Sequence, residues 1–472
     1  EADAALISRC TSISVAATAP NLISWPVGDA PLPDGDPAKT TAGWWGGTDE
    51  PEAAAELEAK LGGPHRVAEM TGSRMMPSGL AAKVRALTGR EGQEYTKEVE
   101  RVQLVSAFVT SVLVGGYVAH DVSDAGGMNL LDVRRGEWAS ECVRAVDPVD
   151  PGRLVRLLGG EVVAPWRVVG GVGGYWKGRF GFEAGCVVVA GSGDNNNAVC
   201  GLGLGAGEMC VSLGTSDTVT FVGRGDAVRP HVRGHVMPHA ALPGAVFAMV
   251  CYRNGAQVRE RIRDVHAAGS WEAFGAALRG PMVDEEGAAV LVYQFDAAEI
   301  VPHGVEGTYA VRVGAGGEVE VLKEAPRGAA YVRAAVLGRA VASRAHAAAL
   351  GLSGVRAVYL TGGGAASREV AQVFSDVMGV AVRVARGAGT NAAALGAALR
   401  AAQGVRVAKA VAAGEAEVAA AEAAYEELRR GVEFETVAEP RAEQRAVMER
   451  VVGQYWVVER AIVEAEIGRA HV

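Results

Sequence analysis

The residues best placed to do chemistry lie in the stretch 191–221, which begins just after an apolar run at 186–190. That run predicts a buried strand. Asp194 follows at its carboxyl end, where α/β proteins place ligand chemistry. One carboxylate beside a glycine-flanked turn suits a general base that acts on a hydroxyl group. Asp194 could instead cap the following helix, and the local pattern alone favours the cap.

Two glycine turns follow along the chain. Gly214, Thr215 and Ser216 separate the two strands predicted over 209–222, and the backbone N–H groups and two hydroxyls of this turn suit an anion. An ordinary hairpin turn is the alternative. The second turn, at residues 362–364, follows a strand predicted over 354–360 and lets a flat or charged ligand approach the backbone closely. The second turn matches neither a P-loop nor a dinucleotide fingerprint.

The elements that position these residues belong to a large chain of ordinary composition. Its 472 residues predict two large domains, and 49% hydrophobic against 21% charged residues excludes a disordered protein. The formal net charge of −9 argues against a general binder of nucleic acid or membrane surfaces. Strands alternate with helical stretches, which predicts an α/β fold.

Individual elements are predicted from the hydrophobic pattern. The expected helices cover 51–62, about 98–113, 328–350 and 440–464, whereas 405–437 is weakly patterned. The apolar run 104–120 is too short and too polar for a membrane span.

The cysteines and histidines point to no metal site. Six cysteines without a CxxC pair predict buried free thiols in a reducing compartment. His231, His235 and His239 have a metal-like spacing, but Pro230, Gly234 and Pro238 interrupt any helix that would align them.

Several motifs, taken in order, resemble the FGGY carbohydrate kinases of the sugar kinase/actin-like superfamily, and more narrowly the eukaryotic-type xylulose kinases. The resemblance covers roughly residues 45–465. It rests on MTGSR (70–74), LVSAFVTSVLVGGY (104–117), DVSDAGGMNLLDVRRGEW (121–138), SGDNN (192–196), SLGTSDTV (212–219), NGAQVRERIR (254–263) and TGGGAASREV (361–370).

The resemblance implies a role for each matching residue. Asp194 would accept the proton of the sugar's C5 hydroxyl, and Arg74 and Asn195 would hydrogen-bond the ketose. Gly214, Thr215 and Ser216 would cradle the transferring phosphate. The nucleotide would contact the residues Gly362, Gly363, Gly364, Ser367 and Trp271, with Ser367 standing where the family pattern usually has asparagine.

The implied activity is ATP-dependent phosphorylation of D-xylulose in cytoplasmic pentose metabolism, with ATP and Mg²⁺ as cofactors. No protein metal ligand is assigned. No nucleic acid or membrane is implied as a partner, and a homodimer is left open.

The implied fold is two ribonuclease H-like α/β domains with a cleft between them. The expected boundaries are 1–190 for an incomplete sugar-binding domain, 191–430 for the nucleotide-binding domain and 431–465 for a C-terminal helix that packs back on the first domain. Residues 466–472 read like a translated adaptor sequence.

The sequence also departs from the family pattern. It carries neither the acidic, Ser/Thr-containing phosphate loop nor the Gln-Gln-His-Gly segment of such kinases. Where Trp-x-Asp is expected, it reads Trp45-Gly46-Gly47, with Asp49 two places late. These departures predict an N-terminally truncated fragment. Another FGGY sugar or polyol kinase and a non-catalytic pseudokinase fragment are the alternatives.

Overall fold

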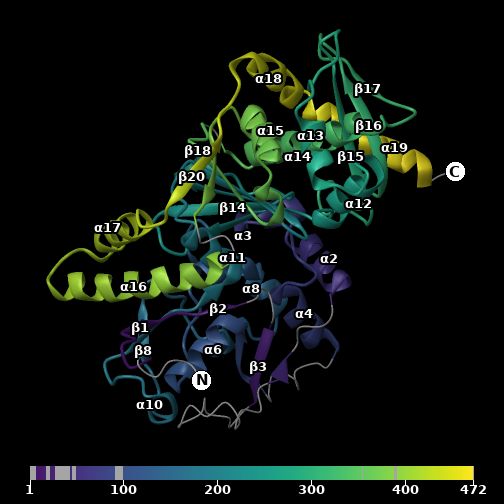
Figure 1. The fold of residues 1–472 in the computed structure, drawn as a ribbon. Helices are drawn as coiled ribbons and strands as arrows, with labels where there is room; N and C mark the ends of the chain where they lie inside the picture. Colours follow the sequence, from purple (N-terminus) through teal and green to yellow (C-terminus); the bar gives the residue numbers. More distant parts are fainter. Residues whose placement is uncertain are drawn as a thin grey trace. The chain divides into compact units, whose positions relative to one another are not determined.

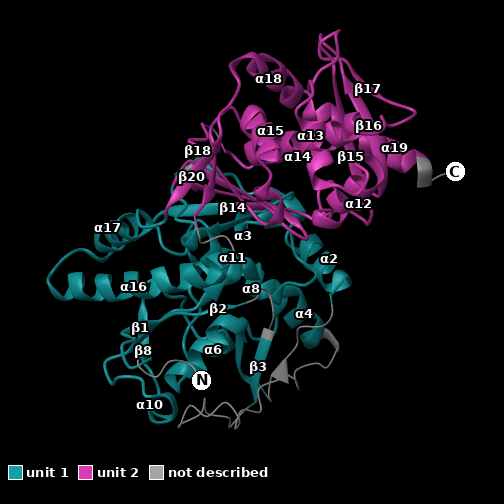
Figure 2. Ribbon diagram, in the orientation of Figure 1, with its two compact units in different colours: residues 1–205, 224–247, 391–432 teal, residues 206–223, 248–390, 433–472 magenta. Residues whose placement is uncertain are grey.

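Strands and helices alternate along the chain in the computed structural model (Figure 1). The structure describes residues 7–17, 22–26, 43–44, 49–90, 99–352, 354–386 and 391–470. The chain divides into two compact units, shown in Figure 2: unit 1 comprises 1–205, 224–247 and 391–432, and unit 2 comprises 206–223, 248–390 and 433–472. The expected α/β fold class is confirmed.

The division into units differs from the boundaries expected from the sequence. Residues 391–432, expected in the second domain, lie in unit 1 because helix α16 (Ala392–Ala412) packs closely against helix α11 (Asp194–Gly201). The C-terminal segment, expected to pack on the first domain, lies in unit 2. There Glu459 accepts a hydrogen bond from the buried Tyr455 and lies 2.8 Å from Nε2 of His346.

Unit 1 combines small sheets with many helices. Its sheets have the strand orders β1-β9-β8, β10-β2, β4-β3-β5 and β6-β7. The strands are β1 (Ser12–Ile13), β2 (Ala16–Ala17), β3 (Leu22–Pro26), β4 (Gly43–Trp44), β5 (Val99–Leu104), β6 (Leu131–Asp132), β7 (Glu137–Trp138), β8 (Val168–Gly171), β9 (Val187–Val189), β10 (Ser192–Gly193) and β13 (His235–Pro238). Besides α11 and α16, the helices are α2 (Pro51–Lys60), α3 (Pro64–Thr71), α4 (Leu80–Arg90), α6 (Val105–Val114), α7 (Val122–Ala125), α8 (Ser140–Val146), α9 (Pro151–Leu157), α10 (Gly174–Phe180) and α17 (Glu417–Arg429).

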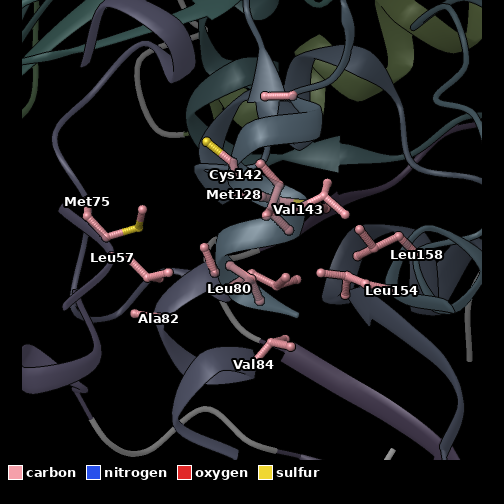
Figure 3. Close-up of a cluster of buried hydrophobic side chains, with 14 of the residues drawn as sticks. Leu57, Met75, Leu80, Ala82, Val84, Met128, Cys142, Val143, Leu154 and Leu158 are labelled. Atoms are coloured by element: carbon pink, nitrogen blue, oxygen red, sulfur yellow. The ribbon is translucent and has the colours of Figure 1, made fainter. Parts of the chain in front are cut away.

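A large apolar cluster fills the part of unit 1 built by α2, α4, α8 and α9 (Figure 3). Leu57 of α2, Leu80 of α4, Val143 of α8 and Leu154 of α9 belong to this cluster and are almost completely buried. Burying such side chains contributes about 1.5–3 kcal/mol each. This core supports the MTGSR segment, residues 70–74.

Unit 2 is built on one long mixed sheet. Its strands run in the order β14-β12-β11-β18-β19-β20, with β11 parallel to β18 and β18 parallel to β19. These strands are β14 (Ala245–Tyr252), β12 (Asp217–Arg224), β11 (Glu208–Leu213), β18 (Ala357–Thr361), β19 (Val382–Ala385) and β20 (Phe434–Ala438). A second sheet contains β15 (Ala289–Phe295), β16 (Gly307–Val313) and β17 (Val319–Val321), and the helices are α12 (Ala256–His266), α13 (Trp271–Leu278), α14 (Ala329–Ala349), α15 (Arg368–Met378), α18 (Arg445–Gly453) and α19 (Tyr455–Ala470).

Two of the predicted helices and one weakly patterned region differ from the structure. The stretch 98–113 begins as strand β5 before it becomes α6, because β5 pairs with β3. The weakly patterned region 405–437 contains the end of α16, all of α17 and strand β20. Alanine gives the buried face of α17 little hydrophobic contrast. The helix predicted over 440–464 is two helices, α18 and α19, and α19 extends through residues 466–470.

Several other predicted elements agree with the structure. Helix α2 and helix α14 lie within their predicted ranges, and β11 and β12 form the two strands expected at 209–222. All six cysteines are free thiols, four of them buried. No helix in the described part of the chain is long and apolar enough to cross a membrane.

Candidate functional site

Asp194 is the first residue of helix α11, directly after strand β10. The residue that caps this helix is Gly193, so the cap interpretation of Asp194 is wrong. The Asp194 carboxylate is half-buried and accepts a hydrogen bond of 2.8 Å from the Asn195 amide. Burial raises the pKa of Asp194, and the Asn195 amide lowers it by less. The result is a partly accessible carboxylate with a raised pKa, which suits a proton acceptor.

Arg74 also belongs to unit 1, where it forms an ion pair with Glu58 of helix α2. Its Nε and Nη2 lie 3.2 Å from the two Glu58 carboxylate oxygens, so the guanidinium is oriented through two bonds. The Arg74 side chain is 46% exposed, which leaves part of the guanidinium accessible. Among the described contacts, Arg74 is joined to Glu58 and not to Asp194 or Asn195.

The segment that carries Arg74 is shaped by Asn129, a residue that sequence reasoning missed. Asn129 is fully buried and has a left-handed backbone, with φ 58°. Its side-chain amide reaches Thr71, Ser73 and the Arg74 carbonyl at 3.0–3.3 Å, while its Oδ1 accepts from the Met76 amide. The side-chain amide of Asn129 therefore holds the segment of residues 71–76 in place. The SDAGGMN stretch was noted as a motif, but this contact spans more than 50 residues and leaves no local signal.

In unit 2, Gly214, Thr215 and Ser216 form the tight connection between β11 and β12. Leu213 pairs with Asp217 across the hairpin, so the hairpin alternative describes the backbone correctly. Thr215 and Ser216 are exposed, whereas Asp217 is buried. The turn thus presents two hydroxyls and is anchored by the carboxylate that follows them.

Two arginines, Arg259 and Arg339, form ion pairs with the Asp217 carboxylate. Nη1 of Arg259 lies 2.8 and 2.7 Å from the two Asp217 oxygens, and its Nη2 donates to the Gly214 carbonyl at 3.1 Å. Arg339, which is mostly buried, lies 3.4 Å from the same carboxylate. The Gly214 carbonyl also accepts from the Ala256 amide at the start of α12. The turn is therefore fixed from both ends before any ligand binds, which is the preorganisation that anion recognition requires.

The second glycine turn lies directly against the first. Because β11 and β18 are parallel neighbours, Leu213 and Thr361 end at the same edge of the sheet. Gly362 has φ +77°, and a Cβ there would lie 2.6 Å from the Leu213 carbonyl oxygen. A Cβ on Gly364 would lie 2.7 Å from the Leu213 side chain. Only glycines permit this approach, which brings residues 362–364 beside the turn at 214–216.

Ser367 and Trp271 occupy helix starts in unit 2. Ser367 caps α15, where its Oγ accepts from the Val370 amide at 3.2 Å. Trp271 begins α13 and is 51% exposed, with the Arg263 guanidinium 4.8 Å from its ring centre. A cation on one side and solvent on the other leave ring surface that a flat ligand could cover.

A cavity of about 50 Å³ lies among these elements, lined by Asp217, Asn254 and Arg259 together with apolar side chains such as Phe274 and Phe374.

The histidines noted in the sequence have separate environments. His239 is buried and accepts hydrogen bonds from the Ala241 and Leu242 amides through Nδ1. The ring of His231 lies against that of His65. Across the residues that the structure describes, no three His, Cys, Asp or Glu side chains are grouped to hold a metal ion.

The buried Asp217 carboxylate, which anchors the turn at 214–216, gives a prediction about stability. Replacing Asp217 by asparagine leaves Arg259 and Arg339 beside a neutral group, so we expect a loss of about 3–5 kcal/mol in the free energy of unfolding, the usual cost of breaking a buried ion pair. Urea unfolding measures the loss. The control is Asp150→Asn, which removes an exposed pair with Arg156 and should cost less than about 1 kcal/mol. Equal losses in the two variants would contradict the buried anchor.

Comparisons with known proteins identify the family of the chain. Residues 36–201 match the model of the N-terminal domain, and residues 209–405 that of the C-terminal domain, of the FGGY family of carbohydrate kinases. Together the matches cover most of the chain. It therefore belongs to the FGGY family of carbohydrate kinases, which confirms the family resemblance.

Individual relatives narrow the comparison. The chain is 34% identical to "Xylulose kinase 2" of Arabidopsis thaliana over 357 residues, 74% of this chain and 62% of the relative. It is 34% identical to the xylulose kinase of Mus musculus over 352 residues, 74% of this chain and 61% of the relative. The chain thus spans about three-fifths of the length of these curated relatives.

Solved structures share the fold. A xylulose kinase from Rhodospirillum rubrum superposes with a TM-score of 0.74 at 16% identity, covering 97% of this chain and 85% of that one. A gluconate kinase from Lactobacillus acidophilus superposes with a TM-score of 0.75 at 14% identity, covering 98% and 87%. These likenesses confirm the expected two-domain sugar kinase fold, and they do not distinguish between sugars.

Proposed function

We propose that this protein phosphorylates D-xylulose at O5, using ATP and forming D-xylulose 5-phosphate. The observation that carries the proposal is the half-buried Asp194 carboxylate with its raised pKa at the start of α11. The two curated relatives described above, both named xylulose kinases, support the choice of sugar.

In the proposed reaction, Asp194 accepts the proton of the C5 hydroxyl as O5 attacks the γ-phosphorus of ATP. The O5–phosphorus bond forms while the bond between the γ-phosphorus and the β,γ-bridging oxygen breaks, and ADP leaves with that oxygen. Arg74 and Asn195 hydrogen-bond the ketose. Such a transfer depends on positioning and charge stabilisation rather than on covalent catalysis by the protein.

The phosphates bind at the turns of unit 2. Thr215 and Ser216 donate from their exposed hydroxyls, and the Gly214 backbone is held in place by Arg259. The residues that we assign to the adenine and ribose are Gly362, Gly363, Gly364, Ser367 and Trp271.

Mg²⁺ enters as the MgATP complex. A magnesium ion usually keeps several waters and binds substrate phosphates with only one or two carboxylates, so its site would not need a cluster of protein ligands. The ion would supply charge neutralisation on the phosphates.

A coupled assay of ADP release tests the substrate. We expect turnover with D-xylulose to exceed turnover with D-ribulose, gluconate or glycerol at equal concentrations. A second FGGY substrate is the alternative, since a gluconate kinase shares the fold equally well. Faster turnover of any other sugar or polyol would contradict the proposed substrate, and sugar binding without ADP release would favour the pseudokinase alternative. Within this proposal, the reaction belongs to cytoplasmic pentose metabolism.

The proposed base also predicts a pH dependence. Asp194 must be ionised to accept a proton, so kcat/KM falls as the pH drops through its pKa. Because burial raises that pKa, we expect the acidic limb to have an apparent pKa above the ordinary 3.8. Initial rates over a pH series at constant ionic strength measure it. An acidic limb at or below 3.8 would contradict a half-buried base.

A further inference from the structure

One buried arginine forms hydrogen bonds with the loop that leads to Asp194 and with the segments around it. Arg400, from helix α16, is fully buried within unit 1. Its guanidinium lies within hydrogen-bond distance of five acceptors: the carbonyl oxygens of Pro165 (2.9 Å), Ala190 (2.9 Å) and Ala240 (3.0 Å), Oδ1 of Asn197 (3.2 Å) and Oδ2 of Asp121 (3.2 Å). Ala190 directly follows strand β9, which leads to the Asp194 turn, so Arg400 fixes this turn at its start.

Asn197 continues the contact to the residues immediately before Asp194. Its side-chain amide nitrogen lies 3.0 Å from the Ser192 carbonyl oxygen and 2.9 Å from that of Gly193. It also reaches the Val15 carbonyl oxygen at 3.2 Å. Asn197 is fully buried, and its Oδ1 accepts from Arg400. Arg400 therefore orients an amide that in turn holds the two residues preceding Asp194.

A second set of hydrogen bonds holds Asn196, the residue of α11 that precedes Asn197. Asp121, paired with Arg400, accepts from the Ser123 and Asp124 amides at 2.6 and 2.9 Å and so caps helix α7. The Ser123 hydroxyl then accepts from the Asn196 side chain at 2.7 Å. Two chains of contacts thus lead from Arg400 to the first turn of α11.

An arginine suits this position for a chemical reason. Its guanidinium carries five N–H donors in a rigid plane, and the sites around it are carbonyl, amide and carboxylate oxygens. A lysine at the same place presents three donors around a single atom and cannot reach acceptors on several segments at once. Neither Arg400 nor Asn197 is exposed, so both act through Asp194 rather than by touching a substrate.

We propose that Arg400 and Asn197 form a positioning clamp that fixes the Asp194 carboxylate for proton abstraction. The inference rests on the proposed function of Asp194. Because a misplacement of about 1 Å can cost on the order of a hundredfold in rate, loosening the clamp should lower kcat while sugar affinity changes little.

The test compares Asn197→Leu with Gln403→Leu. Both changes remove a buried amide of unit 1, but Gln403, one turn further along α16, donates to the Ala241 and Ala421 carbonyls and not to the Asp194 turn. We expect Asn197→Leu to lower kcat for D-xylulose about 10- to 100-fold, with KM within about threefold of the original value. Gln403→Leu should leave kcat within about threefold. Arg400→Lys serves as the second clamp variant, and it replaces Asn197→Leu if that protein does not fold.

Hydrogen exchange of the peptide 190–197 in the protein alone gives a readout that does not depend on turnover. We expect faster exchange there in Asn197→Leu and Arg400→Lys but not in Gln403→Leu. Unchanged exchange, or a loss of kcat no larger than in Gln403→Leu, would overturn the clamp. If no sugar is turned over by the unmodified protein, the proposed function fails, and the exchange comparison still decides whether the clamp holds the turn.

Discussion

We expect the replacement of Asp194 by asparagine to lower kcat for D-xylulose by about 10²–10⁴-fold, the span usually lost with a general base. Asparagine keeps the size of the side chain and can still accept from the Asn195 amide, but it cannot take up the C5 hydroxyl proton. Since α11 begins at this residue without a side-chain cap, the substitution should leave the helix intact. Coupled ADP-release rates measure the loss.

The control is Glu161→Gln, which removes an exposed carboxylate from the same unit and should leave kcat unchanged. D-Xylulose binding, measured by calorimetry, should change little in Asp194→Asn because the amide keeps the polar contact. Near-normal turnover in Asp194→Asn would refute the base. Lost binding with lost turnover would instead assign Asp194 to substrate affinity.

The sequence locates the candidate chemistry because each motif is local. The strand at 187–189, the hairpin at 214–216 and the glycines at 362–364 are all signalled by residues within a few positions of one another. The structure adds that parallel pairing of β11 and β18 brings the two glycine turns together across about 150 residues.

The groups that hold these turns have no such local signal. Arg259 meets Asp217 across 42 residues, and Arg400 meets Asp121 across 279. A buried arginine in an alanine-rich helix looks like a surface residue in the sequence, since arginine is almost never fully buried unless it is paired. The role of Arg400 becomes visible only in the folded structure, where its partners surround it.

The two units differ from the boundaries expected from the sequence for a related reason. The chain leaves unit 1 after residue 205, returns for 224–247 and returns again for 391–432, so neither unit is a continuous segment. Hydrophobic patterns identify single elements, but not which unit an alanine-rich helix such as α16 joins. Helix α16 belongs to unit 1 because it is in close contact with α11.

That contact yields the second large prediction. Helices α11 and α16 cross at Gly201 and Gly396, where a Cβ on Gly396 would overlap the Asn197 carbonyl oxygen. The obstruction is backbone, which cannot rotate away. Gly396→Ala must therefore separate the helices, and we expect a loss of about 3 kcal/mol or more in the free energy of unfolding, at or beyond the upper end of typical overpacking costs.

Gly453→Ala is the matched control for this crossing. Gly453 is also helical, but a Cβ there meets nothing within 4 Å. Alanine favours a helix over glycine by about 1 kcal/mol, so this variant should keep or slightly raise the urea midpoint, whereas Gly396→Ala lowers it. Because α11 carries Asp194, Gly396→Ala should also lower kcat. Equal midpoints in the two variants would mean that α11 and α16 do not cross at these glycines, and the clamp built on Arg400 would lose its framework.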